Sequence, residues 1–166
     1  PVPDQRGAVL EREWVIKEEK AMEGIYEQLE KEIMDYLTPL KSLYKKQLFD
    51  FKMEQDTFGI EVRGYCKDPY TPEKKMEFLL LRIEMNYVDK QIYIPNIFLP
   101  DFMRYQGIGK KLIYKIFLIA EKADYDLFIV DMVDSFYQRM KKRGAVPYED
   151  DVVMITSTTK LVDDVY

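Results

Sequence analysis

The stretch from Leu99 to Leu112, LPDFMRYQGIGKKL, joins a run of strand residues to a run of helical residues. Gly107 and Gly109 carry no side chains, so a ligand can approach the backbone closely at this turn. The first N–H groups of a helix have no partners within the helix, and the helix dipole adds positive potential there. We therefore interpret the stretch as an anion site suited to a phosphate or pyrophosphate, with charge added by Arg104, Lys110 and Lys111.

The segments on either side of this stretch predict a strand–helix–strand unit. Apolar residues at three- and four-residue steps predict a helix over Gly107–Ala123. Gln91–Leu99 and Tyr125–Val133 have the content of buried strands, and a helical crossover between them makes them parallel. Pro95 cannot donate to a strand ladder, so it indicates an edge or a bulge in the first of these strands.

Strands and one more helix are expected around this unit. Phe58, Ile60 and Val62 alternate with polar residues, which predicts a strand, and Met76–Val88 is a second one. Asp89-Lys90 is a plausible hairpin turn. Downstream, Asp134-Ser135 offers an N-cap for a helix that runs to Arg143 and ends at Gly144, and Asp151–Thr159 is a final strand.

The first third of the chain reads as helical. One apolar stripe predicts a helix over Val15–Leu37, which Thr38-Pro39 would end, and a shorter helix over Leu40–Phe51 would follow. Residues 1–13 are polar and look loosely ordered. Each stripe is expected to pack on a core, with an exposed partner-binding face as the alternative.

Composition excludes several kinds of chemistry. The 166 residues suggest one domain, 1–166, and 47% hydrophobic residues argue against wholesale disorder. The formal net charge of −5 disfavours a general nucleic-acid binder. The chain has no histidine and one cysteine, Cys66, so Ser-His nucleophiles, a metal centre built on imidazole or several thiolates, and internal disulfides are excluded. Cys66 is expected to be a small buried residue. No apolar run reaches membrane-spanning length, and we expect a cytoplasmic protein.

The spacing Arg104-x-x-Gly107-x-Gly109 identifies a family resemblance. It is neither the nucleotide P-loop nor the Rossmann fingerprint. In its position between a strand and a helix it resembles motif A, [Q/R]-x-x-G-x-[G/A], of the GCN5-related N-acetyltransferase (GNAT) superfamily. The resemblance covers roughly Phe78 to Thr158. It implies an α/β (α+β) fold: a mixed, mostly antiparallel central sheet with a splayed parallel strand pair and helices on both faces. The extra N-terminal helix departs from the family, and the family's initial strand cannot be placed.

The same resemblance implies where acetyl-CoA would bind as cosubstrate. Its pantetheine arm would lie in the wedge between Gln91–Leu99 and Tyr125–Val133. The residues implied at the acetyl and pantetheine groups are Ile97, Phe98 and Leu99. The residues implied at the pyrophosphate are Arg104, Tyr105, Gln106, Gly107, Ile108, Gly109 and Lys110. Ser135, at the start of the next helix, is a further cofactor-binding candidate.

The catalytic groups are less well specified. Family members often carry a tyrosine four residues before the glycine that ends the second helix, where this chain has Met140 instead. Either the acid is absent, or Tyr137, one turn earlier, protonates the departing thiolate. A carboxylate could remove the proton of the amine, directly or through water, and the candidates are Glu84, Asp131 and Asp134. Asp134 could equally be a helix cap.

The acceptor is an amine of a small molecule or a protein, and the sequence does not identify it. Two other hypotheses compete with an N-acetyltransferase. One is a GNAT-shaped module that binds acyl-CoA without catalysis, and the other is an interaction protein whose N-terminal helices dock on a partner. We expect acetyl-CoA and an amine as partners, no nucleic acid and no membrane, and leave open a homodimer.

Overall fold

The computed structural model of the chain describes residues 5–162. In chain order, its elements are α1 (Gln5–Leu43), β1 (Leu48–Gln55), β2 (Gly59–Lys67), β3 (Lys75–Asn86), β4 (Gln91–Ile97), the 3-10 helix η1 (Asp101–Met103), α2 (Ile108–Lys122), β5 (Asp126–Ile129), α3 (Asp134–Lys142), β6 (Val146–Glu149) and β7 (Val152–Ile155).

The strands form one seven-stranded sheet in the order β1-β2-β3-β4-β5-β7-β6. β4 and β5 pair in parallel, from Gln91 beside Asp126 to Ile94 beside Ile129. The other neighbours in the sheet are antiparallel. The expected fold class, a mixed and mostly antiparallel sheet with one parallel pair and flanking helices, is confirmed.

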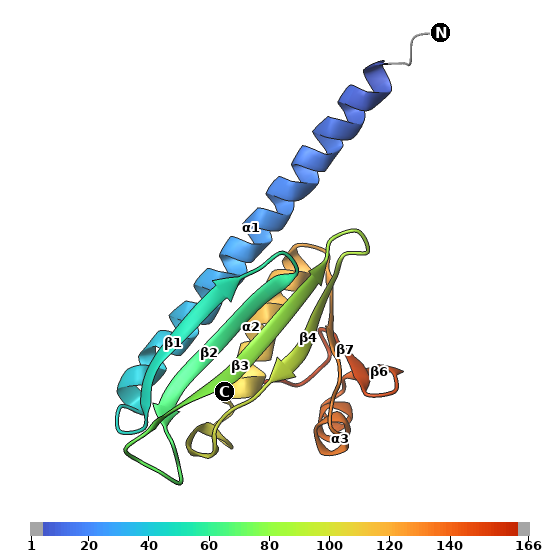
Figure 1. Cartoon of the computed structure of the whole chain (residues 1–166). Coiled ribbons are helices and arrows are strands. Elements are labelled where there is room, and N and C mark those ends of the chain that lie inside the picture. Colours follow the sequence, from blue (N-terminus) through green and yellow to red (C-terminus); the bar gives the residue numbers. More distant parts are fainter. Residues whose placement is uncertain (1–4, 163–166) are drawn as a thin grey trace.

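Helices α1 and α2 lie behind strands β1–β4 in the view of Figure 1 and contact each other. Leu29, Ile33 and Leu37 of α1 are completely buried, as are Leu112 and Ile116 of α2. Burying an aliphatic side chain of this size contributes roughly 1.5–3 kcal/mol. Packing against α1 and the sheet therefore holds α2, and with it the turn at its N-terminus, in place.

The expectation that Thr38-Pro39 ends the first helix is wrong, because α1 runs on to Leu43 with Pro39 inside it. Proline lacks the N–H that would bond to the carbonyl of Asp35. The loss falls in the last turns of the helix, where Leu37 and Leu40 on either side are buried and hold the backbone in place. Packing therefore outweighs the local signal.

The expectation of a second helix over Leu40–Phe51 is also wrong, because a turn follows α1 and Leu48 begins β1. Leu48 and Phe51 are both buried, at a spacing that is typical of a helix. In the strand, the register shifts between Leu48 and Asp50 because of a bulge at Phe49. The extra residue changes the alternation, so side chains three apart face the same side.

The N-terminal half of α1 extends beyond the sheet (Figure 1). Residues 5–13, expected to be loosely ordered, are helical, whereas residues 1–4 lie outside the described part of the chain. Trp14 and Ile16 are 59% and 51% exposed. Among the α1 side chains whose burial is described, Met22 is the first that packs against the core. The helix is thus anchored through its second half.

Several smaller features near the C-terminus differ from expectation. The residue that caps α3 is Val133, without a side-chain hydrogen bond, so the Asp134-Ser135 cap is not formed. β7 is shorter than the predicted final strand, because residues 156–159 form a turn. β6 was not predicted; it is a short, exposed edge strand that contains Pro147. Cys66 is buried, as expected, and burial raises the pKa of its thiol.

Candidate functional site

The turn before α2 presents free backbone amides. Gly107 is the N-cap residue, at φ 76°, in the left-handed region that glycine adopts without strain. The first hydrogen bond of the helix runs from the Lys111 amide to the Gly107 carbonyl at 3.0 Å. The amides of Ile108, Gly109 and Lys110 therefore have no acceptor within the helix. No side chain caps them, so this end of α2 can receive an anion.

A cleft of about 660 Å³ opens beside this turn. Its walls come from the end of β4, the loop after it, the start of α2 and one face of α3. The lining residues are Ile97, Phe98, Leu99, Arg104, Tyr105, Gly107, Ile108, Gly109, Lys110, Ile113, Val133, Phe136, Arg139, Met140 and Arg143. Most are apolar, four are cationic and none is a carboxylate, although the chain as a whole is acidic. The cleft therefore combines an apolar wall with a positive potential.

The parallel strand pair opens toward this cleft. The register of β4 with β5 ends at Ile94, where the Val130 amide donates to the Ile94 carbonyl at 3.1 Å. β4 stays paired with β3 as far as Ile97, and the Phe98 amide donates to the Leu80 carbonyl at 2.8 Å. The two strands thus separate beyond Ile94, as the expected wedge requires.

The irregularity expected at Pro95 is present. In the register of β3 with β4, Glu84 pairs with Tyr93 and Arg82 pairs with Asn96. Ile94 and Pro95 therefore lie opposite a single residue of β3, which makes a bulge. A bulge bends the strand and re-aims the residues that follow it. It precedes Ile97, the first residue of β4 that lines the cleft.

The arginines that line the cleft already make contacts with other parts of the protein. Arg104 donates from Nε to the Leu99 carbonyl at 2.8 Å and pairs with Asp101 at 3.0 Å. Arg143 donates to the Lys160 carbonyl at 3.0 Å. Arg139 lies with its guanidinium carbon 5.6 Å from the centre of the Phe136 ring, on its own helix. The loop and α3 thus hold guanidinium groups at the rim of the cleft from two sides.

The structure brings together most of the predicted cofactor residues. All of them line the cleft except Gln106 and Ser135, which are exposed outside it. Val133, the residue that caps α3, and Phe136 and Met140 of that helix also line the cleft, and none of the three was predicted as a cofactor-binding residue. Their spacing of three and four residues, together with the run of basic residues at the end of this helix, was the available signal.

The predicted catalytic residues lie apart from one another. Tyr137 is half-buried on α3 with Lys141 Nζ 5.3 Å from the centre of its ring, and it is not among the residues that line the cleft. Asp131 is exposed after β5, at a φ of 54°. Asp134 is exposed in the first turn of α3 and accepts from Gln138 at 3.4 Å. Glu84 lies on β3, in register with Tyr93.

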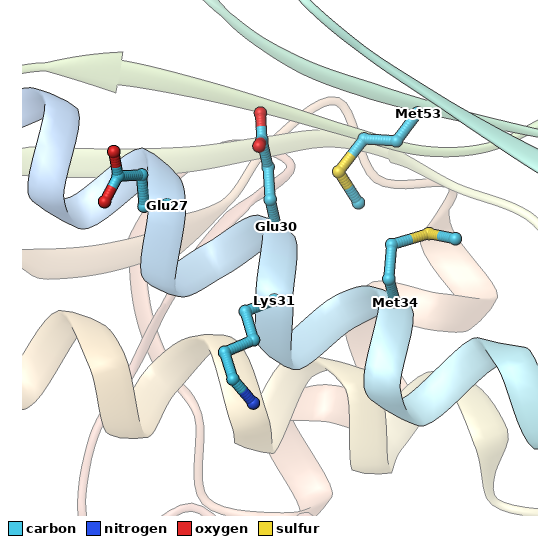
Figure 2. A pocket seen from close by; sticks show the side chains of 5 residues that line it. All are labelled: Glu27, Glu30, Lys31, Met34 and Met53. Atoms are coloured by element: carbon cyan, nitrogen blue, oxygen red, sulfur yellow. The ribbon is translucent and has the colours of Figure 1, made fainter.

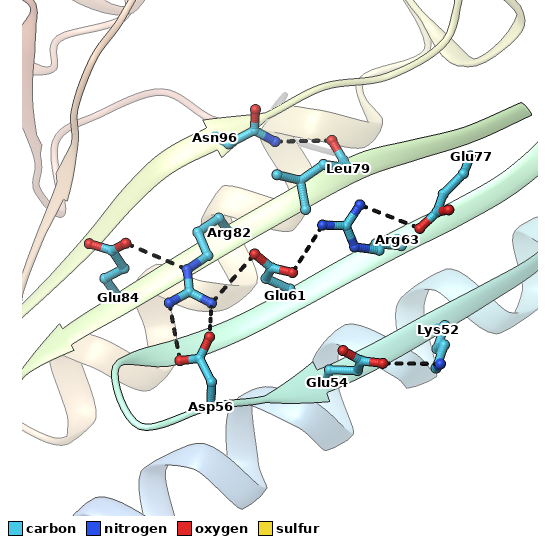
Figure 3. Close-up of polar contacts among 10 residues, drawn as sticks. All are labelled: Lys52, Glu54, Asp56, Glu61, Arg63, Glu77, Leu79, Arg82, Glu84 and Asn96. Atoms are coloured by element: carbon cyan, nitrogen blue, oxygen red, sulfur yellow. Dashed lines mark hydrogen bonds and ion pairs between the residues drawn. The ribbon is translucent and has the colours of Figure 1, made fainter.

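Glu84 belongs to an ion-pair network on the face of the sheet opposite the buried core (Figure 3). Arg82 is the centre of this network and contacts Asp56 at 2.6 Å, Glu61 at 3.7 Å and Glu84 at 3.5 Å. The hydrogen bond from Arg82, with further bonds from the backbone amides of Phe58 and Gly59, lowers the pKa of Asp56 to about 2. The network ties the β1–β2 turn to β3.

A second, open groove of about 470 Å³ lies between α1 and β1 (Figure 2). Glu27, Glu30, Lys31, Met34 and Met53 line it. Glu30 and Lys31 point to different sides of α1, and Lys31 pairs with Asp35 at 2.6 Å. These groups do not converge on a common point, so the groove is not organised as a polar site.

Among residues 5–162, no group of three Asp, Glu, Cys or His side chains is placed to hold a metal ion. Over the same range, none of the helices is both long and apolar enough to span a membrane.

Comparisons with known proteins give little. No family model matches the chain, and no curated protein matches it. Among solved structures it is similar to the crystal structure of a "putative acetyltransferase" from Agrobacterium tumefaciens, with 16% sequence identity and a TM-score of 0.33. The match covers 75% of this chain and 87% of that chain. At this TM-score the similarity carries no argument about activity. Any argument about function therefore has to come from the residues of the cleft.

Proposed function

We propose that the chain binds acetyl-CoA in the cleft and transfers the acetyl group to an amine. The observation that carries this proposal is the cleft itself: four cations, no carboxylate and an apolar wall, beside the free amides of α2. A phosphate group suits the amides of Ile108, Gly109 and Lys110. A thin, uncharged arm suits the apolar wall between these amides and Ile97 at the end of β4.

The residues present fit the parts of this cosubstrate. An alanine-sized group at Gly109 would contact Ile97 and Leu99 at ordinary distance, 3.7 Å, and Gly107 faces open space. Within residues 5–162, no atom lies closer than ordinary contact distance to a Cβ placed at either glycine. Arg139, Arg143 and Lys110 supply positive charge around them. The cavity volume is within the range of small-molecule sites.

The reaction is a direct transfer. The lone pair of a neutral amine attacks the thioester carbonyl, a C–N bond forms, and the C–S bond breaks. The amine proton goes to a base or to water, and the departing thiolate takes up a proton. Positioning and electrostatic stabilisation supply most of the rate in reactions of this kind.

The proposed donor to the developing oxyanion is a backbone N–H group near Ile97–Leu99. The amide of Phe98 already donates to the Leu80 carbonyl. We therefore assign the oxyanion contact to the amide of Ile97 or Leu99, on the part of the chain that lies beyond the β5 pairing. Tyr137 stays the proposed proton donor to the thiolate, and Glu84 and Asp131 stay the proposed bases.

One observation favours the second candidate function, binding of acyl-CoA without turnover. The side chain of α3 that is buried at the cleft is Met140, which cannot donate a proton. Under this alternative the cleft would bind the cosubstrate with the same residues, and no acceptor would be modified.

Acetyl transfer to a panel of amines separates the two functions. The panel contains lysine peptides, polyamines, aminoglycosides and amino acids, with release of free thiol and the mass of each acceptor as readouts. Thiol release matched by a gain of one acetyl group on an acceptor supports the transferase. Binding of acetyl-CoA without transfer to any acceptor supports the binding module, and no binding contradicts both.

A further inference from the structure

Two residues that are unfavourable in strands follow each other in the central strand of the sheet. Pro95 lacks the N–H group that a ladder needs, and asparagine, the type of residue 96, is depleted in strands. Both lie in β4, the fourth of the seven neighbouring strands. Such departures from local preference are expected where function requires them. The bulge of β4 accounts for Pro95, so Asn96 needs a physical reason of its own.

The Asn96 side chain reaches across to β3 (Figure 3). Its Nδ2 donates to the Leu79 carbonyl at 3.0 Å, in a partly buried contact. This carbonyl lies beside a second bulge. The register of β2 with β3 shifts between Val62 and Arg63, which leaves Leu80 without a partner on β2. A bulge disrupts the ladder locally, and here the side-chain amide of Asn96 binds the backbone beside it.

Two hydrogen bonds to β3 lie on either side of Ile97. Asn96 donates from its side chain to the Leu79 carbonyl. The backbone amide of Phe98 donates to the next carbonyl, that of Leu80, at 2.8 Å. Consecutive carbonyls of β3 thus bind the residues that precede and follow Ile97. The backbone at Ile97 is therefore held by two contacts that leave its own amide unused.

The direction of the Ile97 amide follows from these contacts. Successive backbone N–H groups of a strand point to opposite edges, and the amide of Phe98 points toward β3. The Ile97 amide therefore points to the other edge, where the pairing with β5 has ended at Ile94. Ile97 is also the last residue of β4 and lines the cleft. Its amide is thus directed into the wedge.

We propose that Asn96 is a positioning residue for the acetyl transfer, and that the Ile97 amide is the donor to the oxyanion. The proposal rests on the proposed function. As the amine attacks, a C–N bond forms and the π pair of the thioester carbonyl moves to its oxygen, which accepts from the Ile97 N–H group. The pair then returns, the C–S bond breaks to release the thiolate, and the amine proton goes to a base or to water. Asn96 touches neither reactant and acts by holding β4.

Loss of the Asn96 contact should affect turnover more than binding. Removing an oxyanion donor lowers kcat on the order of 10²–10³-fold. Asn96→Ala keeps the Ile97 amide and releases only the backbone that holds it, so we expect a smaller loss of kcat, about tenfold. Acetyl-CoA binding relies on the amides of α2 and the apolar wall, so its affinity should change less than about twofold.

The test needs no acceptor, because infrared spectroscopy detects a hydrogen bond to the thioester carbonyl. Acetyl-CoA labelled with ¹³C at this carbonyl is bound to the parent chain, and its C=O band is compared with that of free acetyl-CoA. Donation from the Ile97 amide lowers the stretching frequency. We expect a shift to lower frequency in the parent and at most about half of that shift in Asn96→Ala. No shift in the parent, or the full shift in the variant, overturns the proposal.

Asn86 provides the matched control. It is the last residue of β3, and its Nδ2 donates to Asp89 at 2.9 Å, so Asn86→Ala also removes one hydrogen bond of a side-chain amide. Neither Asn86 nor Asp89 lines the cleft, and the control variant should keep the full infrared shift. An equal reduction in the two variants would reveal a general effect on the sheet and refute the role of Asn96.

Hydrogen exchange gives a second readout that does not require acetyl-CoA. Exchange of the Phe98 amide should become about tenfold faster in Asn96→Ala and stay unchanged in Asn86→Ala. Unchanged exchange in Asn96→Ala would contradict the positioning role. Urea denaturation checks that the variants are folded. If Asn96→Ala does not fold, Asn96→Ser takes its place, because its hydroxyl is about one bond too short to reach the Leu79 carbonyl.

Calorimetry with acetyl-CoA separates this proposal from the proposed function. Absence of binding to the parent chain would remove the proposed function and the role of Asn96 with it. Normal binding to the parent and to Asn96→Ala, with the same carbonyl band in both, would remove the role of Asn96 alone.

Discussion

The backbone amide of Phe98 donates to the carbonyl of Leu80 at 2.8 Å, beyond Ile94, the last residue of β4 in register with β5. The end of β4 thus stays hydrogen-bonded to β3, whereas its pairing with β5 has already ended. A parallel pair that separates in this way leaves the amides of Ile97 or Leu99 for a ligand. This relationship links the fold to the proposed chemistry.

The two adjacent lysines of α2 offer a matched test of the cleft. Lys110 lines it, whereas Lys111 is exposed outside it. Lys110→Gln is expected to weaken acetyl-CoA binding about fivefold to tenfold through loss of a charge-assisted contact, and Lys111→Gln less than twofold. Calorimetry at two salt concentrations measures both. Equal losses for the two variants would show that long-range charge, rather than this cleft, attracts the ligand.

Replacing Tyr137 tests the proton donor. If its hydroxyl protonates the departing thiolate, Tyr137→Phe should lower kcat on the order of a hundredfold and leave acetyl-CoA affinity unchanged, because the ring stays in place. Met140→Leu is the control, since it keeps an apolar side chain at the cleft and should change kcat little. A kcat for Tyr137→Phe equal to that of the parent would assign protonation to water.

The Asp56–Arg82 pair predicts a pH dependence of stability. The folded-state pKa of Asp56 is about 2, below its ordinary value of 3.8. The pair therefore stabilises the fold above about pH 4, and its contribution is lost as pH falls toward about 2. We expect the urea midpoint of the parent to fall more steeply over this window than that of Asp56→Asn. Parallel curves for the two proteins would contradict the assignment.

A matched pair of isoleucines tests which half of α1 supports the fold. Ile33 is completely buried, whereas Ile16 is 51% exposed. Ile33→Ala should lower the free energy of unfolding by about 2–5 kcal/mol, and Ile16→Ala by less than about 0.5 kcal/mol. Urea denaturation measures both. A large loss for Ile16→Ala would indicate that the projecting half of α1 has a partner in solution.

Much of the fold follows from local sequence pattern. The turn at Gly107, the helix after it and the parallel strands around it were predictable, because their periodicities are regular and their connection is short. The errors fall where tertiary packing outweighs a local signal, at Pro39 inside α1, and where a bulge imitates helical spacing, at Leu48 and Phe51.

The site was predictable only in part. Contiguous residues near Gly107 share one loop, so the motif indicated them together. The residues of α3 that complete the cleft, among them Met140, come from a distant part of the chain. The contact between Tyr148 and Phe128 depends on a bulge at Tyr148 in an edge strand that local pattern does not indicate. Such contacts arise from how strands are placed, which periodicity alone does not specify.

The most direct test of the central proposal is calorimetry of acetyl-CoA binding to the parent chain and to Gly109→Glu. The replaced position lies in the first turn of α2, where an added Cβ would be 3.7 Å from the side chains of Ile97 and Leu99, and glutamate places a negative charge among the free amides. We predict binding to the parent with an affinity near micromolar, about 8 kcal/mol, and no detectable binding to a variant that keeps its circular dichroism spectrum. Undiminished binding to the folded variant, or no binding to the parent, would contradict the assignment of this cleft to acetyl-CoA.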